Sequence, residues 1–168
     1  MNLEFNTTLV LNQPYDQARR RILAVLKKQC LQVAFDFDVA GSILRSAEVR
    51  LPKSSVLGVG CPYQLLEAFV ADGAAAVFLP LHIVLSEHGS ETQVRMLAPQ
   101  ALRAAGVSPA ISIPVHRTLR RIHEALASIG IHSANRRHEG RSPLENELPG
   151  EVLQGELREA WNEETIVR

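Results

Sequence analysis

The stretch VLGVGCPYQLLEAFVADGAAAVFLPLHIVLSEHGSETQVRMLAP, residues 56–99, decides the fold of this chain. It predicts a strand, a glycine-rich turn, a helix that begins at Pro62, and a hairpin of two further strands. Proline suits the first turn of a helix, because that position needs no backbone N–H donor. A loop at residues 87–90, with Gly89 available for a positive φ, closes the hairpin. No residue set in the stretch specifies a reaction.

The flanking sequence supplies more strands and helices in an alternating order. Residues 31–39 alternate between apolar and polar side chains, as a half-buried strand does. This pattern predicts one apolar face that comprises Leu31, Val33, Phe35, Phe37 and Val39. Asp36 and Asp38 then share the other face, about 7 Å apart. Paired carboxylates could hold a metal or transfer protons, but an exposed sheet face is the favoured interpretation.

The predicted fold is α+β, a two-layer arrangement of an antiparallel sheet of about five strands with helices packed on one face. Residues 40–50 fit either a short helix or a strand. Pro80 within the first hairpin strand indicates an edge position or a bulge. The predicted strands are 3–11, 31–39, 53–59, 77–86 and 92–98, and the predicted helices are 14–29, 62–72 and 114–129.

Composition limits the function classes. The chain has 168 residues, 46% of them hydrophobic, enough for one core, and its formal net charge is zero. A neutral chain offers no global argument for nucleic acid or an anionic membrane. The N-terminus has no signal-peptide pattern and the longest apolar run, residues 74–85, is too short to span a bilayer, so we expect a cytoplasmic protein.

The composition changes after residue 131. We expect a domain over residues 1–131 and a polar, flexible tail over residues 132–168. One tail segment, residues 151–161, could form a weak helix that presents Leu153, Leu157 and Trp161. Trp161 is then either a docking anchor or an exposed ring.

Three phrases resemble the family called domain of unknown function 302: LGVGCP at residues 57–62, LLEAF at 65–69 and FLPLHIVLSEHG at 78–89. The resemblance covers roughly residues 3–130. It implies a small α+β domain with helices on one face of an antiparallel sheet, usually paired as a homodimer. It implies no established activity.

The departures from the family pattern concern cysteine. Gly60 stands where the family usually has its first cysteine, with Cys61 shifted into the next position, and Leu81 stands where its second cysteine usually lies. The chain therefore lacks that cysteine pair, which disfavours a function built on it.

The predicted ligand-binding residues are Gly58, Gly60, Cys61 and His82. A glycine-rich turn before a helix can cradle an anion, although Gly60 could simply permit a tight turn. Cys61 at a helix N-terminus is the best reactive candidate, with His82 as its possible base. A buried, inert Cys61 is the favoured alternative. We assign no catalytic residue, metal or cofactor.

Basic side chains gather on two predicted helices, at residues 19–21 and 117–121. On the last helix, His116, Arg120 and His123 share one side, but the two histidines lie about 10.5 Å apart along the axis and cannot share one metal ion. The leading hypothesis is a non-enzymatic, homodimeric module that binds a protein or a small ligand, for which an anion is the candidate. The alternatives are an enzyme using Cys61 with His82, and weak nucleic-acid binding through these basic helix faces.

Overall fold

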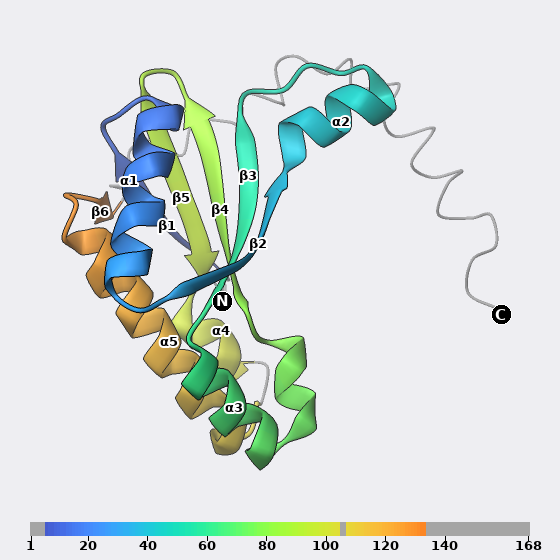
Figure 1. Cartoon of the computed structure of the whole chain (residues 1–168), viewed down its shortest axis with the longest axis vertical. Coiled ribbons are helices and arrows are strands. Elements are labelled where there is room, and N and C mark those ends of the chain that lie inside the picture. Colours follow the sequence, from blue (N-terminus) through green and yellow to red (C-terminus); the bar gives the residue numbers. More distant parts are fainter. Residues whose placement is uncertain (1–5, 105–106, 134–168) are drawn as a thin grey trace, which may run out of the picture. The chain divides into compact units, whose positions relative to one another are not determined.

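A computed structural model describes residues 6–104 and 107–133 of the chain, and Figure 1 shows a twisted sheet with two long helices lying against it. The strands are β1 (Asn6–Leu11), β2 (Gln32–Asp38), β3 (Ser54–Gly60), β4 (Leu81–His88), β5 (Glu91–Leu97) and β6 (His132–Ser133). The helices are α1 (Tyr15–Lys28), α2 (Val39–Ala47), α3 (Pro62–Ala71), α4 (Pro99–Ala104) and α5 (Pro109–Ala127), with a 3-10 helix η1 (Gly73–Val77).

The sheet has six strands in the order β2-β3-β4-β5-β1-β6, and every neighbouring pair is antiparallel. The two-residue strand β6 is an addition to the five strands that the sequence predicts. The α+β fold class is confirmed. The β4–β5 hairpin is tighter than predicted, because His88 pairs with Glu91 and only Gly89 and Ser90 form the turn. Gly89 has a φ of 61°, which glycine adopts without strain.

Helices α1 and α5 cover one face of the sheet, and the core lies between these layers (Figure 1). Apolar residues recur on each helix every three or four positions, so that one stripe faces the strands. The buried side chains of these helices include Ala18, Ile22, Leu26, Val115, Leu119, Ile122 and Leu126. They meet alternate residues of the strands, including Leu9, Leu57, Val59, Ile83, Leu85 and Val94.

A β-bulge in β2 overturns the predicted alternation of that strand. Val33 pairs with Val59, but Phe35 already pairs with Gly58, so Ala34 is an extra residue. A bulge changes the phase of a strand, and side chains beyond it point to the opposite face. Leu31 and Val33 therefore pack against the core, whereas Phe35 and Phe37 lie on the face that α1 and α5 leave uncovered.

The same phase change turns Asp36 and Asp38 toward the helix-covered face, and both are exposed there, at the edge strand of the sheet. Asp36 forms an ion pair with Arg19 of α1. Asp38 caps α2, its Oδ1 accepting a hydrogen bond of 2.9 Å from the backbone N–H of Gly41. Both carboxylates thus have structural partners. The ambiguous stretch at residues 40–50 is resolved as the helix α2, none of whose residues is buried by the described part of the chain.

Proline positions account for two further corrections. Strand β4 begins at Leu81, after a cis Leu79–Pro80 peptide, so Pro80 precedes a central strand and does not occupy an edge. Helix α5 begins at Pro109, and Pro114 lies inside it, not at its start. A proline within the second turn of a helix removes only one backbone N–H donor. Residues 132 and 133 of the predicted tail form β6, and the rest of that tail, residues 134–168 with Trp161, lies outside the described residues.

Candidate functional site

The sheet separates the two residues of the predicted thiol enzyme. His82 pairs with Gly58, and its exposed side chain lies on the uncovered face. Cys61 belongs to the core cluster on the helix-covered side, where only 5% of it is exposed. The structure does not bring Cys61 and His82 together, which argues against a Cys61–His82 pair as nucleophile and base.

Gly58 makes room for an aromatic ring. A Cβ atom at this position would lie 2.2 Å from Cε1 of Phe35, closer than atoms can approach. The Phe35 ring lies over Gly58 and contacts the His82 ring edge to face, with ring centroids 5.5 Å apart. At Gly60, by contrast, a Cβ would meet Pro80 at an ordinary 3.6 Å. Gly58 therefore serves packing on the uncovered face and lies away from the predicted anion cradle.

A cleft of about 500 Å³ opens beside Cys61. It lies where α1 ends, β2 begins, α3 begins and one side of α5 passes. Its cationic side chains are Lys27 and Arg121, and none of the described residues that line it is acidic. The lining residues are Lys27, Cys30, Leu31, Gln32, Cys61, Pro62, Tyr63 and Arg121.

Arg121 joins three elements at this cleft. Its Nη1 donates a hydrogen bond of 3.3 Å to Sγ of Cys61, and its Nη2 donates one of 2.6 Å to the carbonyl oxygen of Gln29. The guanidinium thus bridges the end of α1 and the N-terminus of α3 from its place on α5. It also places a positive charge against the Cys61 sulfur.

Cys30, the second cysteine of the chain, lines the same cleft. It has a φ of 54° where α1 gives way to β2, and its backbone N–H donates to the carbonyl oxygen of Lys27. Both cysteines are free thiols, Cys30 exposed and Cys61 buried. Two thiols therefore line one cleft, although neither cysteine stands at the positions usual in the family.

The predicted basic side of α5 borders a second, smaller groove. His116, Arg120 and His123 line a groove of about 260 Å³ together with residues of β1 and β5. Nε2 of His116 lies 3.2 Å from the carbonyl oxygen of Pro99, and Nε of Arg120 lies 3.6 Å from a carboxylate oxygen of Glu124. The groove is neither strongly charged nor enclosed.

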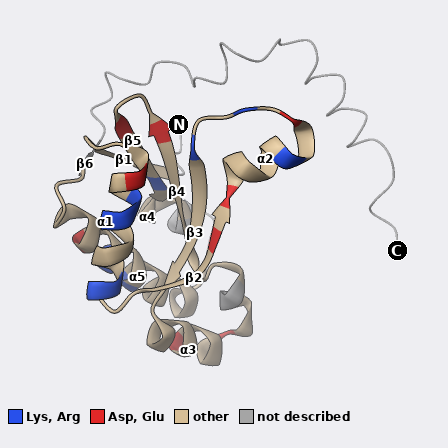
Figure 2. Cartoon of the chain, turned by 45° about the horizontal axis from the view of Figure 1, so that its top comes forward, with Lys and Arg blue, Asp and Glu red and all other residues tan. Residues whose placement is uncertain are grey.

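Several of the arginines predicted to form basic helix faces have partners within the chain. Arg21 donates to the carbonyl oxygen of Ile129, and Arg117 donates to both carboxylate oxygens of Glu67, at 2.8 and 3.1 Å. Figure 2 shows basic and acidic segments interspersed along the described elements. The Arg117–Glu67 ion pair reduces the positive charge that a nucleic acid would meet on α5, so the structure gives this alternative little support.

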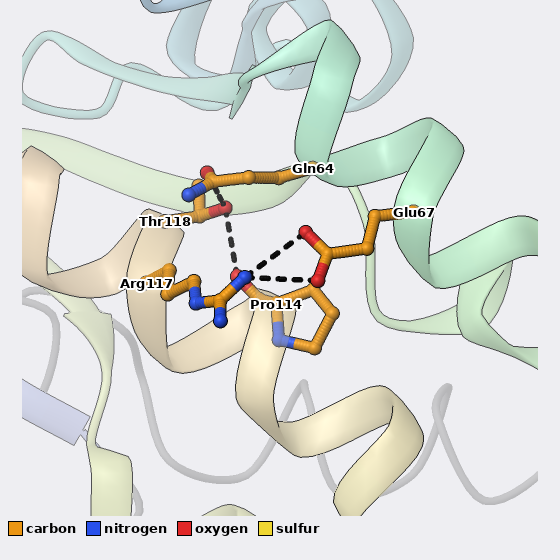
Figure 3. A network of polar contacts seen from close by, with 5 residues as sticks. All are labelled: Gln64, Glu67, Pro114, Arg117 and Thr118. Atoms are coloured by element: carbon orange, nitrogen blue, oxygen red, sulfur yellow. Dashed lines mark hydrogen bonds and ion pairs between the residues drawn. The ribbon is translucent and has the colours of Figure 1, made fainter. Parts of the chain in front are cut away.

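Polar contacts attach α3 to α5 (Figure 3). Beside the Arg117–Glu67 pair, the Thr118 hydroxyl lies 2.6 Å from Oε1 of Gln64 and 3.1 Å from the carbonyl oxygen of Pro114. In α3, Ala68 alone is buried by the described part of the chain. The predicted apolar side of this helix is largely exposed: Leu65, Leu66, Phe69 and Val70.

Among the residues that the structure describes, no three His, Cys, Asp or Glu side chains gather closely enough to hold a metal ion. Within residues 6–104 and 107–133, no helix combines the length and apolar character needed to cross a membrane.

The fold and the site together define a two-layer α+β domain with one open sheet face and a cleft at the start of α3. The family described as Domain of unknown function DUF302 matches residues 7–129, and the chain belongs to this family. The resemblance of the sequence phrases is thereby confirmed.

One solved relative extends the comparison. The crystal structure of the uncharacterized conserved protein DUF302 from Bacillus stearothermophilus is similar, with a TM-score of 0.67 and 18% sequence identity. The similarity covers 74% of this chain and 98% of that one. At this identity it shows the fold alone. Among curated proteins, none matches the chain.

Sequence reasoning identified Cys61 but missed Cys30 and Arg121 as residues of the cleft. A signal for Cys30 was available: it immediately precedes the predicted strand at 31–39, and Cys61 comes two residues after the predicted strand at 53–59. If those strands pair antiparallel, the start of one meets the end of the other. The approach of Arg121 depends on the packing of α5 and has no local signal.

Proposed function

We propose that this chain is a non-enzymatic interaction module that forms a homodimer through the uncovered face of its sheet. The observation that supports the proposal is the apolar character of that face. Phe35 and Phe37 are 41% and 51% exposed there. We call this face, with Phe35, Phe37, Val56, His82 and Val84, the open face.

Antiparallel sheets commonly keep one face in water, and that face is then mainly polar. On β2, β3 and β4 this face instead presents phenylalanine and valine side chains, and aromatic residues are enriched at protein interfaces. On β5 the same face carries the polar residues Gln93 and Arg95. Helix α2, which directly follows β2, has a further exposed apolar side chain, Leu44, at 43%. A second copy is a suitable partner, because a two-fold axis lets the same patch serve both subunits and a neutral chain does not repel its copy.

Sedimentation equilibrium at micromolar concentration tests the dimer. We expect a dimer for the wild type and a monomer for Phe37→Asp, because a buried unpaired carboxylate is costly. Phe69→Asp is the matched control, since Phe69 is similarly exposed but lies on α3, and it should stay dimeric. A monomeric wild type, or a dimer that Phe69→Asp disrupts and Phe37→Asp does not, would contradict the proposal.

The second candidate function is binding of a small anion in the cleft beside Cys61. Lys27 and Arg121 line this cleft, and so do Pro62 and Tyr63, the first residues of α3. A helix N-terminus favours negative charge. We propose a cytoplasmic location for this function, where free thiols stay reduced. Thermal unfolding with inorganic phosphate tests binding: phosphate should raise Tm of the wild type and raise it less in Lys27→Gln.

A further inference from the structure

We propose that the cleft is a thiol–disulfide exchange site for a small anionic disulfide, in which Cys30 accepts the mixed disulfide and Cys61 resolves it. The inference deepens the anion-binding candidate for this cleft and does not depend on the dimer. It assigns a chemical class of reactant to a site that sequence reasoning connected with a single thiol.

The strand register brings the two thiols to one place. The β2–β3 ladder ends with Gln32 opposite Gly60. Cys61 follows this pair by one residue on β3, and Cys30 precedes it by two on the other strand. Continued past this pair, the register sets Leu31 opposite Cys61, so Cys30 lies one residue from the position opposite Cys61. Both side chains line the same cleft, so no element separates them.

Exposure distinguishes the roles of the two cysteines. A reactant that carries bulky groups on both sulfurs needs an accessible thiol, and Cys30 is the exposed one. Cys61 is only 5% exposed and cannot easily accept such a group itself. It is suited to attack a mixed disulfide already formed on its neighbour.

Charge determines the class of reactant. Nη1 of Arg121 lies 3.3 Å from the Cys61 sulfur and places a positive charge at this end of the cleft. Lys27 lies at the rim beside Cys30, and none of the described lining residues carries an opposing carboxylate. A disulfide with carboxylate groups therefore meets two cations, whereas a cationic disulfide is repelled.

The exchange balances in two steps. In the first, the Cys30 thiolate attacks one sulfur of R–S–S–R, the bond between the reactant's sulfurs breaks, and one RS⁻ leaves. In the second, the Cys61 thiolate attacks the Cys30 sulfur, a Cys30–Cys61 bond forms, and the second RS⁻ leaves. The protein gives up two electrons and its two thiol protons, and the small disulfide is reduced to two RSH. The reaction is stoichiometric, so the module needs no turnover.

Intact mass spectrometry of the reduced full-length chain tests this scheme, with oxidised glutathione as the probe and acid to stop the exchange. The wild type should lose two hydrogen atoms and retain no adduct. Cys61→Ser should accumulate one glutathione adduct on Cys30, and Cys30→Ser should react several-fold more slowly. Arg121→Gln should retain the adduct on Cys30 several-fold longer than the wild type. A lasting adduct in the wild type, no reaction, or equal labelling of the two single variants would overturn the exchange.

Two controls separate the possible failures. Cys61→Ala repeats the Cys61 result if the serine hydroxyl disturbs the core, and circular dichroism verifies that each variant folds. Cystamine, a cationic disulfide, should react several-fold more slowly than oxidised glutathione, and Lys27→Gln should reduce that difference. Equal rates for the two disulfides would overturn the anionic preference, while an internal disulfide would still support the exchange. If the wild type binds phosphate but forms no Cys30–Cys61 disulfide, the exchange is overturned and only the anion-binding site stands.

Discussion

The two faces of the sheet carry similar side chains in different surroundings. On the helix-covered face, Leu57, Ile83 and Val94 are completely buried. On the open face, Phe35 and Phe37 are about half exposed although phenylalanine is among the most apolar residues. The difference shows that apolar character alone does not decide burial. Burial also requires a second layer over the sheet face, and α1 and α5 cover one face only.

Neighbouring residues of β4 give the largest expected contrast. Ile83→Ala should lower the free energy of unfolding by about 3 kcal/mol, because it leaves a cavity in the core. Val84→Ala, which removes a half-buried side chain of the open face, should cost about 1 kcal/mol or less. Urea unfolding in the Phe37→Asp background provides the measurement, since that variant should not pair.

The same comparison can then be repeated in the wild type. If a second copy covers the open face, the cost of Val84→Ala should rise and should depend on protein concentration. Equal costs for Ile83→Ala and Val84→Ala in the monomeric background would mean that the two faces do not differ as described.

The two glycines of β3 give the next contrast. Gly58→Ala should cost about 1–3 kcal/mol, because a Cβ 2.2 Å from the Phe35 ring forces that ring off the strand. Gly60→Ala should be neutral or stabilise by up to about 0.5 kcal/mol, since its Cβ meets ordinary contact distances. Thermal unfolding distinguishes them. The ring-current shift of His82 should also disappear in Gly58→Ala alone, and its persistence would contradict this account.

Tyr15 tests the covered face through pH. Burial raises the pKa of the Tyr15 hydroxyl above its ordinary value near 10, although its hydrogen bond to Ser55 opposes the shift. Folding therefore favours the neutral phenol. This stabilisation is complete below the unfolded-state pKa and is lost as the pH rises through the folded-state pKa.

Tyr15→Phe should cost about 1 kcal/mol at neutral pH, because the buried Ser55 hydroxyl loses its partner. Above pH ~10, the stability of the variant should also decline less than that of the wild type. Urea midpoints between neutral and alkaline pH measure both effects. An alkaline decline that is identical in the wild type and Tyr15→Phe would exclude Tyr15 as its source.

The smallest effect is expected at the rim of the covered face. Asp36→Asn should cost about 0.5 kcal/mol, because the Asp36–Arg19 ion pair is one-third exposed and screened by water. The loss should diminish further at high salt. Equilibrium unfolding at low and high ionic strength measures it, and a salt-independent cost would indicate a role for Asp36 other than the ion pair.

The order of elements could be predicted because its signals are local. Apolar periodicity predicted α1 and most of α5, and Pro62 and Gly89 marked a helix start and a turn. The face of Phe35 could not be predicted, because the bulge at Ala34 depends on pairing with Gly58 on another strand. The alternation continues through the bulge without interruption, so the sequence contains no sign of the change.

The candidate site could likewise be predicted only where its signals are local. Cys61 lies at a turn that the sequence marks, and the structure places it in a cleft. Its neighbours come from tertiary packing: Arg121 is 60 residues away along the chain. The packing of helix α3 could not be predicted from its sequence either. Its apolar residues are typical of a core helix, but polar contacts attach it to α5.

The strand order has a consequence for synthesis of the chain. β1 pairs on one side with β5, joining Asn6 to Leu97, and on the other with β6. The hairpin β4–β5 can form from neighbouring residues, but β1 has no partner strand until β5 has been made. Pairings between distant residues are slow to close. The first strand to leave the ribosome must therefore wait, with its apolar side chains uncovered, for most of the domain to follow.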